Sequence, residues 1–396
     1  MKEENRRYAE EAFEIVEHAA KKIGSRLPGS DGEKEYAAYM GDKLRSIGIE
    51  PVREEFAVSP RASIGGIPYA GYLGLIMSAL VYVALHLSAV WYGMALASVV
   101  CWVWLILSVF LYKTWFDMFF KQEISQNTYG ELLPPDGKYD YTIILSGHTD
   151  TSWCWRHSAH ASKFKKTKPA MGLVATFAKV GFGVICFLFL TAVSIAMTVI
   201  SSGVYFGEVW ALKIANSASF ANFLFAMHFL PVVTAIGCMF VVMWADPNPR
   251  NASRGAMDNA TGCALSFAVT KYFHDHPEKM PKNCRIIDFN CGSEEAGLRG
   301  SIAFTREHKG EPILENTWNI NIDSVADKDF FEVVIKDDWQ FCRFDTDLEK
   351  MFKDTFNELG IVSKTNGCIH NPVGGCDSTP MTKAGMKSAV SYTHLR

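Results

Sequence analysis

Four short segments, far apart in the chain, carry residue types that bind divalent metals. They hold one histidine, three aspartates and a pair of adjacent glutamates, and the segments are His148-Thr-Asp150, Asp258-Asn259, Glu294-Glu295 and Asp323. Imidazole and carboxylate groups in such a set hold ions such as zinc, and a pair of ions activates water for attack on amide bonds. The sequence therefore predicts a hydrolytic metal centre, provided that the four segments meet in the fold.

His148 follows the apolar run Tyr141–Ser146, and Asp150 lies two positions further on. Residues two apart in a strand share a face. Asp150 can therefore contact the second ring nitrogen of an imidazole whose first nitrogen binds a metal. A histidine at a strand end is also commonly a polar cap, and the spacing alone leaves both interpretations open.

The adjacent carboxylates of Glu294 and Glu295 repel each other unless a cation neutralises them. One of them can bind a metal while the other, with a raised pKa, takes a proton from water. The alternative is a solvated acidic turn. Small residues before and after the pair, Gly292-Ser293 and Ala296-Gly297, would let the backbone approach a site closely.

Asp258 and Asp323 each have an ordinary explanation when considered alone. Asp258 precedes a helical pattern, where aspartate is a common N-cap. Asp323 ends the apolar run Trp318–Ile322, where a turn residue is expected. Asp323 is also placed for a site at the carboxyl edge of an open sheet, where α/β proteins bind ligands.

Helix and strand patterns alternate around these residues. Helical spacing covers Glu10–Ile23, Glu33–Ile47, Thr261–His274 and Leu348–Leu359, and strand patterns cover Glu50–Ser59, Tyr141–Ser146, Cys284–Cys291, Trp318–Ile322 and Lys387–Tyr392. The alternation predicts an α/β fold with a mostly parallel mixed sheet and helices on both faces.

Two inserted regions have the composition of membrane helices. No Asp, Glu, Lys or Arg occurs from Ala62 to Tyr112. Four apolar runs each have roughly the 20 residues that cross a bilayer, namely Tyr69–Leu87, Trp91–Tyr112, Val180–Ser201 and Phe220–Trp244. We expect two transmembrane hairpins, at 62–115 and 171–246, which divide one globular domain into 1–61, 116–170 and 247–396. Helices buried in a large soluble core are the alternative.

Charge and cysteine usage restrict the compartment and the partners. Lys and Arg gather near the domain-side ends of the hairpins, as at Arg61, Lys113 and Lys179, which places the domain in the cytoplasm and makes the lipid bilayer a partner. The run Lys163–Lys168 either contacts lipid headgroups or only sets topology. A net charge of −3 without long single-sign runs gives no support for nucleic-acid binding. Ten scattered cysteines indicate free thiols, and the polar N-terminus has no signal peptide.

The globular segments resemble the co-catalytic zinc exopeptidases, the family of the bacterial leucyl aminopeptidases and glutamate carboxypeptidases (metallopeptidase clan MH). The residues that carry the resemblance, in family order, are Arg26–Ser30, His148-Thr-Asp150, Asp258-Asn259, Ser293–Ser301 and Asp323. The resemblance implies two zinc ions and a peptide substrate. It implies that His148 and Asp323 bind one ion, that Glu295 binds the other and that Asp258 bridges them. Glu294 would be the general base and Asp150 the partner that orients His148, while the substrate side would be shaped by Asn259, Gly374, Gly375 and Asp377.

Two departures limit what the resemblance transfers. The fifth family ligand, a histidine well downstream of the Gly-Gly-x-Asp segment, has no match before Arg396, and His394 follows Gly385 too closely. We therefore expect a C-terminally truncated sequence and a weakened centre. Ser378 after Asp377 makes substrate preference unsafe to transfer.

The expected activity is that of a membrane-anchored aminopeptidase acting on short peptides, with a carboxypeptidase left open. The alternatives are a catalytically impaired membrane scaffold or binding module, and a single-zinc transferase resembling glutaminyl cyclases. The sequence gives no indication of the oligomeric state.

Overall fold

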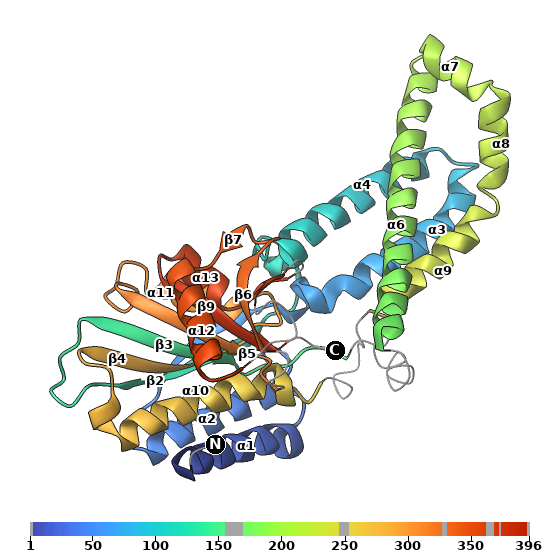
Figure 1. Ribbon diagram of the computed structural model, residues 1–396. Coiled ribbons are helices and arrows are strands. Elements are labelled where there is room, and N and C mark those ends of the chain that lie inside the picture. The colour runs from blue at the N-terminus through green and yellow to red at the C-terminus, as the bar shows by residue number, and fades with distance from the viewer. Residues whose placement is uncertain are drawn as a thin grey trace. The chain divides into compact units, whose positions relative to one another are not determined.

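The computed structural model describes residues 3–154, 169–244, 253–326, 331–361, 368–371 and 374–393. The chain forms two compact units (Figure 1). The first unit consists of Met1–Ile64, Phe110–Trp153 and Asn248–Leu395, and the second is built from Gly65–Val109 and Cys154–Pro247.

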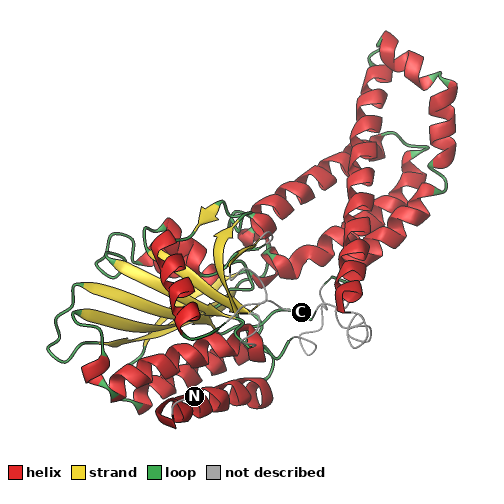
Figure 2. Cartoon of the chain, viewed as in Figure 1, coloured by secondary structure: helices red, strands yellow, loops and turns green. Residues whose placement is uncertain are grey.

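A nine-stranded mixed sheet forms the centre of the first unit (Figure 2). Its strands follow the order β1-β2-β4-β3-β5-β9-β6-β7, and β8 pairs with β6. The pairs β3–β4, β3–β5 and β5–β9 are parallel. The strands are β1 (Val52–Val58), β2 (Glu123–Leu132), β3 (Tyr141–His148), β4 (Cys284–Cys291), β5 (Thr317–Asp323), β6 (Phe331–Asp337), β7 (Cys342–Arg343), β8 (Cys368–Asn371) and β9 (Lys387–Thr393).

Helices cover both faces of this sheet (Figure 1). On one face, Ile15 and Tyr36 pack in one buried cluster with Phe267. On the other face, Phe304 and Met381 pack against strand residues of β2, β3 and β4. The helices are α1 (Glu3–His18), α2 (Asp31–Ser46), α10 (Thr261–Asp275), α11 (Arg299–Glu307), α12 (Thr346–Glu358) and α13 (Ser378–Lys383).

Local sequence explains where several of these elements begin and end. Ser30 caps α2, because its hydroxyl accepts a hydrogen bond from the Glu33 amide, and Asp31 and Glu33 lie at the positive end of the helix. Gly48 follows the helix with a φ of 79°. All eight residues of β4 are buried, as expected for a central strand covered on both faces.

The predicted α/β fold, with a mixed sheet between helical layers, is confirmed. Elements that the sequence patterns missed include β2, β6, α11 and α13. Strand β2 was missed because its centre, Ser125–Thr128, is polar although it is buried. A hydrophobic pattern cannot detect such a strand.

The second unit is helical. Its helices are α3 (Ile67–Ala84), α4 (Ala89–Trp104, continued by a π-helical turn over Leu105–Phe110), α6 (Pro169–Tyr205), α7 (Val209–Ala215), α8 (Ala218–Ala226) and α9 (Leu230–Val242). Small residues allow close approach between α3 and α9, since a Cβ on Gly74 would meet Cys238 Sγ at 2.3 Å. Ser78 and Thr234 share a hydrogen bond of 2.9 Å. Small residues and hydroxyl pairs of this kind are typical of helix packing in membranes.

Three helices of the described residues are long and apolar enough to cross a membrane, namely Ile64–Ala84, Ala89–Phe110 and Ala178–Tyr205. A fourth span exists if Ala218–Ala226 and Leu230–Val242 count as one, although they are bent by 48°. Pro231 lies in the first turn of α9, directly after this break, where its missing amide costs no helical hydrogen bond.

Candidate metal centre

Three parallel strands deliver the predicted ligands to one edge of the sheet. His148 is the last residue of β3 and pairs with Cys291, the last residue of β4. The Glu294-Glu295 pair follows β4 three residues later, and Asp323 is the last residue of β5, on the other side of β3. Because parallel strands end at the same edge, residues distant in sequence converge there.

Asp258 reaches the same edge from the turn that precedes α10. His148 Nε2 lies 3.0 Å from Asp258 Oδ1 and 4.0 Å from Glu294 Oε2. One ligand atom from each of His148, Asp258 and Asp323 can be chosen so that all lie within 4.8 Å of one another. The structure thus brings together one imidazole and at least three carboxylates that the chain supplies from separate segments.

Asp150 lies behind the imidazole and also holds the glutamate loop. Its Oδ1 is 3.2 Å from His148 Nδ1. Its two carboxylate oxygens accept hydrogen bonds from the amides of Glu294 and Glu295, each at 2.9 Å. One fully buried side chain therefore holds the loop that carries the acidic pair and lies against the imidazole ring.

Arg26 connects the two loops that carry His148 and Asp258. The guanidinium is fully buried and donates hydrogen bonds to carbonyl oxygens on both sides of the site. Nε donates to Thr149 O at 2.8 Å, and Nη1 and Nη2 donate to Arg254 O and Gly255 O at 2.8 and 2.9 Å. The sequence placed Arg26 in the segment Arg26–Ser30, which carries the family resemblance, but gave no sign of this role.

Glu33 holds the loop that carries Glu294 and Glu295 through hydrogen bonds to Ser293. Its carboxylate accepts hydrogen bonds from the amides of Gly29 and Ser293, both at 2.6 Å, and from the Ser293 hydroxyl at 2.9 Å. Burial, together with the nearby Asp150 carboxylate, raises the pKa of Glu33 to about 8. Gly292 is required beside it, because a Cβ there would lie 2.3 Å from Gln126 O.

Three acidic groups of the site, Glu294, Glu295 and Asp323, have raised pKa values. Burial raises the pKa of Glu294 well above its usual range, and Glu295 adds to this effect. Burial and the Asp258 carboxylate do the same for Glu295, and they raise the pKa of Asp323 to about 7. Burial alone would lower the pKa of His148, but its contacts with Asp150 and Asp258 outweigh burial and raise it. Carboxylates crowded in this way need a cation to remain ionised together.

The donor set fits zinc. Zinc takes imidazole nitrogen and carboxylate oxygen at about 2.0–2.2 Å, so its ligand atoms lie roughly 3–4 Å from one another. The separations around His148, Asp258 and Asp323 match this with small adjustments. These residues would hold a zinc ion, with Asp150 orienting the imidazole from its other nitrogen as partners of metal-bound histidines do.

A cleft of about 480 Å³ opens over the centre. It is lined by His148, Asp258, Glu294, Glu295 and Asp323, and also by Gly374 and Gly375 from the predicted substrate segment. Asn259 and Asp377 do not line it. Asn259 Nδ2 donates to Ile322 O at 2.9 Å and its Oδ1 accepts from the Gly262 amide at 2.9 Å. Asp377 accepts from the Ser301 hydroxyl at 2.9 Å.

Tyr112 is a cleft residue that sequence reasoning missed. It has a left-handed φ of 53° and is buried, and its ring lies against Gly297 and Gly375. Its carbonyl accepts a hydrogen bond of 2.8 Å from the buried Arg299. Burial and the nearby Glu294 raise the pKa of Tyr112 well above its usual value. The sequence placed Tyr112 at the end of a membrane helix, which concealed its position beside the glutamate pair.

Three further histidines, His157, His160 and His394, lie outside the described residues. The only group of metal-binding side chains found among the described residues is the one around His148.

Residues 239–391 match the model of Peptidase family M28. This segment is therefore similar to peptidase family M28. The match includes Asp258, Glu294, Glu295 and Asp323, whereas His148 and Asp150 precede it. The predicted resemblance to zinc exopeptidases is thus confirmed at the family level, and the family supports a zinc-dependent peptidase.

Several solved structures are similar to the whole chain. A zinc aminopeptidase from Bacillus subtilis has 13% identity and a TM-score of 0.49, over 97% of this chain and 85% of that one. A leucine aminopeptidase precursor from Bacteroides thetaiotaomicron has 12% identity and a TM-score of 0.48, over 98% and 85%. A glutaminyl cyclase from an Acidobacteriales bacterium has 12% identity and a TM-score of 0.47, over 96% and 78%. No curated protein sequence matches the chain.

Proposed function

We propose that this protein is a membrane-anchored di-zinc exopeptidase that removes N-terminal residues from short peptides. The observation that carries the proposal is the convergence of His148, Asp258 and Asp323 within 4.8 Å, beside the Glu294-Glu295 pair and under an open cleft. In this proposal His148 and Asp323 would hold one ion, Glu295 would hold the other, and Asp258 would contribute to both.

The bound ions would polarise the scissile carbonyl and make water a stronger acid. The residues of the chain perform the other tasks. Glu294, whose pKa burial raises, accepts a proton from the attacking water and returns it to the leaving amine. Asp150 keeps the His148 ring in one orientation and, through two backbone amides, keeps the Glu294 loop in place. Gly374 and Gly375 leave room in the cleft for the substrate backbone.

The test is cleavage of aminoacyl-amide substrates by the full chain in detergent, with zinc content measured on the same samples. Glu294→Gln is expected to retain zinc and to lose about 10²–10⁴-fold in kcat, the usual contribution of a general base. Glu278→Gln, an exposed change on a distant turn, serves as the control. Cleavage that survives either chelation or Glu294→Gln would contradict the mechanism.

The direction of cleavage is tested separately with blocked peptides. An aminopeptidase cleaves a peptide amidated at its C-terminus and leaves an N-acetylated peptide intact. The opposite pattern would assign a carboxypeptidase to the same centre.

A non-hydrolytic, metal-binding scaffold is the second candidate. The observation that favours it is that the described residues form one three-ligand group and no second one around Glu295. One zinc ion per chain without measurable peptide cleavage would support this candidate over the first.

A further inference from the structure

A second hollow, of about 680 Å³, lies on the first unit. Most of its lining residues come from three parts of the chain: the segment Leu111–Trp115, helix α11 with the residues on either side of it, and helix α13. It shares only Tyr112 with the cleft over the metal centre. None of its other lining residues takes part in the proposed chemistry.

Four basic side chains line this hollow, against two acidic ones. The basic residues are Lys113, Arg306, Lys309 and Lys383, and the acidic residues are Glu311 and Glu315. Within the described part of the chain, no side-chain hydrogen bond or ion pair is found for any of these four cations. Other lysines of the unit differ, since Lys121, Lys336 and Lys353 each contact a carboxylate.

Two cations of the hollow, Lys113 and Lys383, are close enough for one to affect the other. Partial burial lowers the pKa of Lys383, and the charge of Lys113 lowers it further. Cations that share a partly desolvated hollow repel each other, and a bound anion removes that repulsion. The charge pattern therefore fits a ligand that carries a concentrated negative charge.

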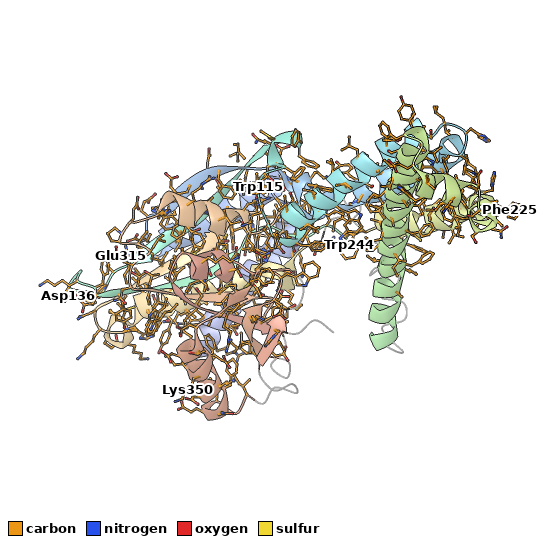
Figure 3. All side chains as sticks on the ribbon, turned by 90° about the horizontal axis from the view of Figure 1, so that it is seen from above. Trp115, Asp136, Phe225, Trp244, Glu315 and Lys350 are labelled. Atoms are coloured by element: carbon orange, nitrogen blue, oxygen red, sulfur yellow. The ribbon has the colours of Figure 1, made fainter. Side chains whose placement is uncertain are left out.

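The hollow also has an apolar wall that continues onto the surface. Leu111, Leu298, Ile302 and Leu314 line it, together with Trp115. Trp115 is 68% exposed, and Met118 and Phe119 after it are each 74% exposed. Figure 3 shows where Trp115 lies on the unit. Contiguous exposed apolar residues of this kind mark a contact surface.

The position of this segment in the chain indicates what the surface contacts. Lys113 lies three residues after Phe110, the last residue of the candidate membrane span Ala89–Phe110. Three extended residues reach at most about 11 Å. The headgroup layer on each side of a bilayer is roughly 5–8 Å thick. When this helix spans a bilayer, Lys113 therefore lies within about 11 Å of the end of the span, in the headgroup layer or at its outer boundary, and Trp115 follows two residues later.

We propose that this hollow binds the headgroup of an anionic phospholipid. Lys113, Arg306, Lys309 and Lys383 neutralise the phosphate, while Trp115, Met118 and Phe119 enter the bilayer interface beside it. A free phosphate ion offers the same charge but leaves the apolar wall exposed to water, and this favours the lipid as the occupant. The site would hold the first unit against the membrane surface, independently of whether this unit hydrolyses peptides.

Native mass spectrometry of the detergent-solubilised full chain tests the proposal. Retention of a phosphatidylglycerol is compared with that of a phosphatidylcholine of the same acyl chains, with and without millimolar inorganic phosphate. The triple change Lys113→Gln, Lys309→Gln and Lys383→Gln is expected to weaken phosphatidylglycerol binding about a hundredfold, from the usual contribution of each basic residue near an anionic headgroup. Phosphatidylcholine retention should change little.

A matched control removes three charges elsewhere. Lys22→Gln, Lys138→Gln and Lys350→Gln change the net charge equally at exposed positions outside the hollow, and Lys350 lies far from Trp115 (Figure 3). This control should bind phosphatidylglycerol as the unchanged chain does.

Three outcomes would overturn the proposal. The first is that both triple changes weaken phosphatidylglycerol binding equally. The second is that the unchanged chain retains phosphatidylglycerol no better than phosphatidylcholine. The third is that inorganic phosphate displaces the lipid fully, which would indicate a soluble anion as the ligand. The lipid measurements on the unchanged chain require no variant, so a variant that fails to fold does not remove the test. Peptide cleavage is not a readout, so failure of the proposed function would leave this result unaffected.

Discussion

Asp288 illustrates, at the scale of one residue, what burial does to a carboxyl group in this sheet. It lies in the middle of β4 and is fully buried. The Ser266 hydroxyl and Asn290 Nδ2 donate to its Oδ1 at 2.7 and 3.1 Å, and no partner for Oδ2 is found in the described residues. Burial raises the pKa of Asp288 to about 7, despite these two hydrogen bonds.

Asp288→Asn is expected to stabilise the protein at pH 8 and to have little effect at pH 4.5. The unfolded chain has an aspartate pKa of about 3.9. The folded state therefore binds the extra proton between about pH 4 and 7, and its stability falls as pH rises through this range. Above pH 7 the folded state carries the full free-energy cost of the ionised, buried carboxylate. This cost is at most about 4 kcal/mol for a pKa raised by about three. Asparagine carries no charge and avoids this cost.

Thermal melts in detergent at the two pH values measure the effect. Asp354→Asn, at an exposed position of α12, is the matched control and should leave the melting temperature unchanged. A melting difference between Asp288→Asn and the unchanged chain that is the same at both pH values would show that Asp288 is ionised throughout.

Tyr112→Phe addresses a single hydroxyl beside the glutamate pair. Tyr112 lines the cleft, and its hydroxyl lies near Gly374 in the predicted substrate segment. Loss of one hydrogen bond to a bound peptide costs about 0.5–1.5 kcal/mol, so kcat/KM is expected to fall about 2- to 13-fold. Zinc content should not change. Tyr139→Phe, outside the cleft, is the control, and an unchanged kcat/KM for Tyr112→Phe would remove the hydroxyl from substrate binding.

At the scale of elements, the centre depends on loops that are held together by backbone hydrogen bonds. Arg26 links the carbonyls of Thr149, Arg254 and Gly255. This places the Asp258 turn against the end of β3. Arg26→Ala removes those donors and leaves buried carbonyls unpaired. It is expected to weaken zinc binding about 10–100-fold, as changes to residues supporting a metal site do, in addition to destabilising the fold.

Arg285→Ala separates the two effects in that experiment. Arg285 is also buried, but it contacts Thr142 and Glu131 on the strands, away from the cleft. It should lower the melting temperature without changing zinc affinity, measured by competition with a chelating dye. Equal zinc affinities for the two variants would show that Arg26 stabilises the fold without positioning the ligands.

The sequence predicts the metal ligands better than it predicts the residues that hold the ligand-bearing loops in place. His148 and Asp323 end apolar strands, and the strand register that brings them together follows from parallel pairing. Arg26 and Glu33 act on backbone groups of distant loops, and no local pattern specifies such partners. Tyr112 belongs to an apolar run whose composition indicates a membrane helix, although its ring packs against the glutamate loop.

At the scale of the whole molecule, the sheet restricts how the apolar helices can cross a bilayer. In the sequence, β1 precedes the first insert and β2 follows it, and the two strands pair along seven residues. In the same way, β3 precedes the second insert and β4 follows it, and these strands pair along eight residues. The chain therefore leaves and re-enters the same globular unit around each insert. A bilayer must then be crossed an even number of times within each insert.

This even number favours four spans. After α6 has crossed the bilayer, the bent pair α8–α9 would cross it in the opposite direction. Reporter insertions in a bacterial host test it. Alkaline phosphatase inserted after Ser88, between α3 and α4, or after Asn216, between α7 and α8, is expected to be active outside the cytoplasm. Inserted after Gly137, in a turn of the first unit, it should be inactive, because basic residues such as Arg61 and Lys179 keep their side cytoplasmic. Activity after Ser88 but not after Asn216 would mean that α6 does not cross, since three crossings cannot return the chain to β4.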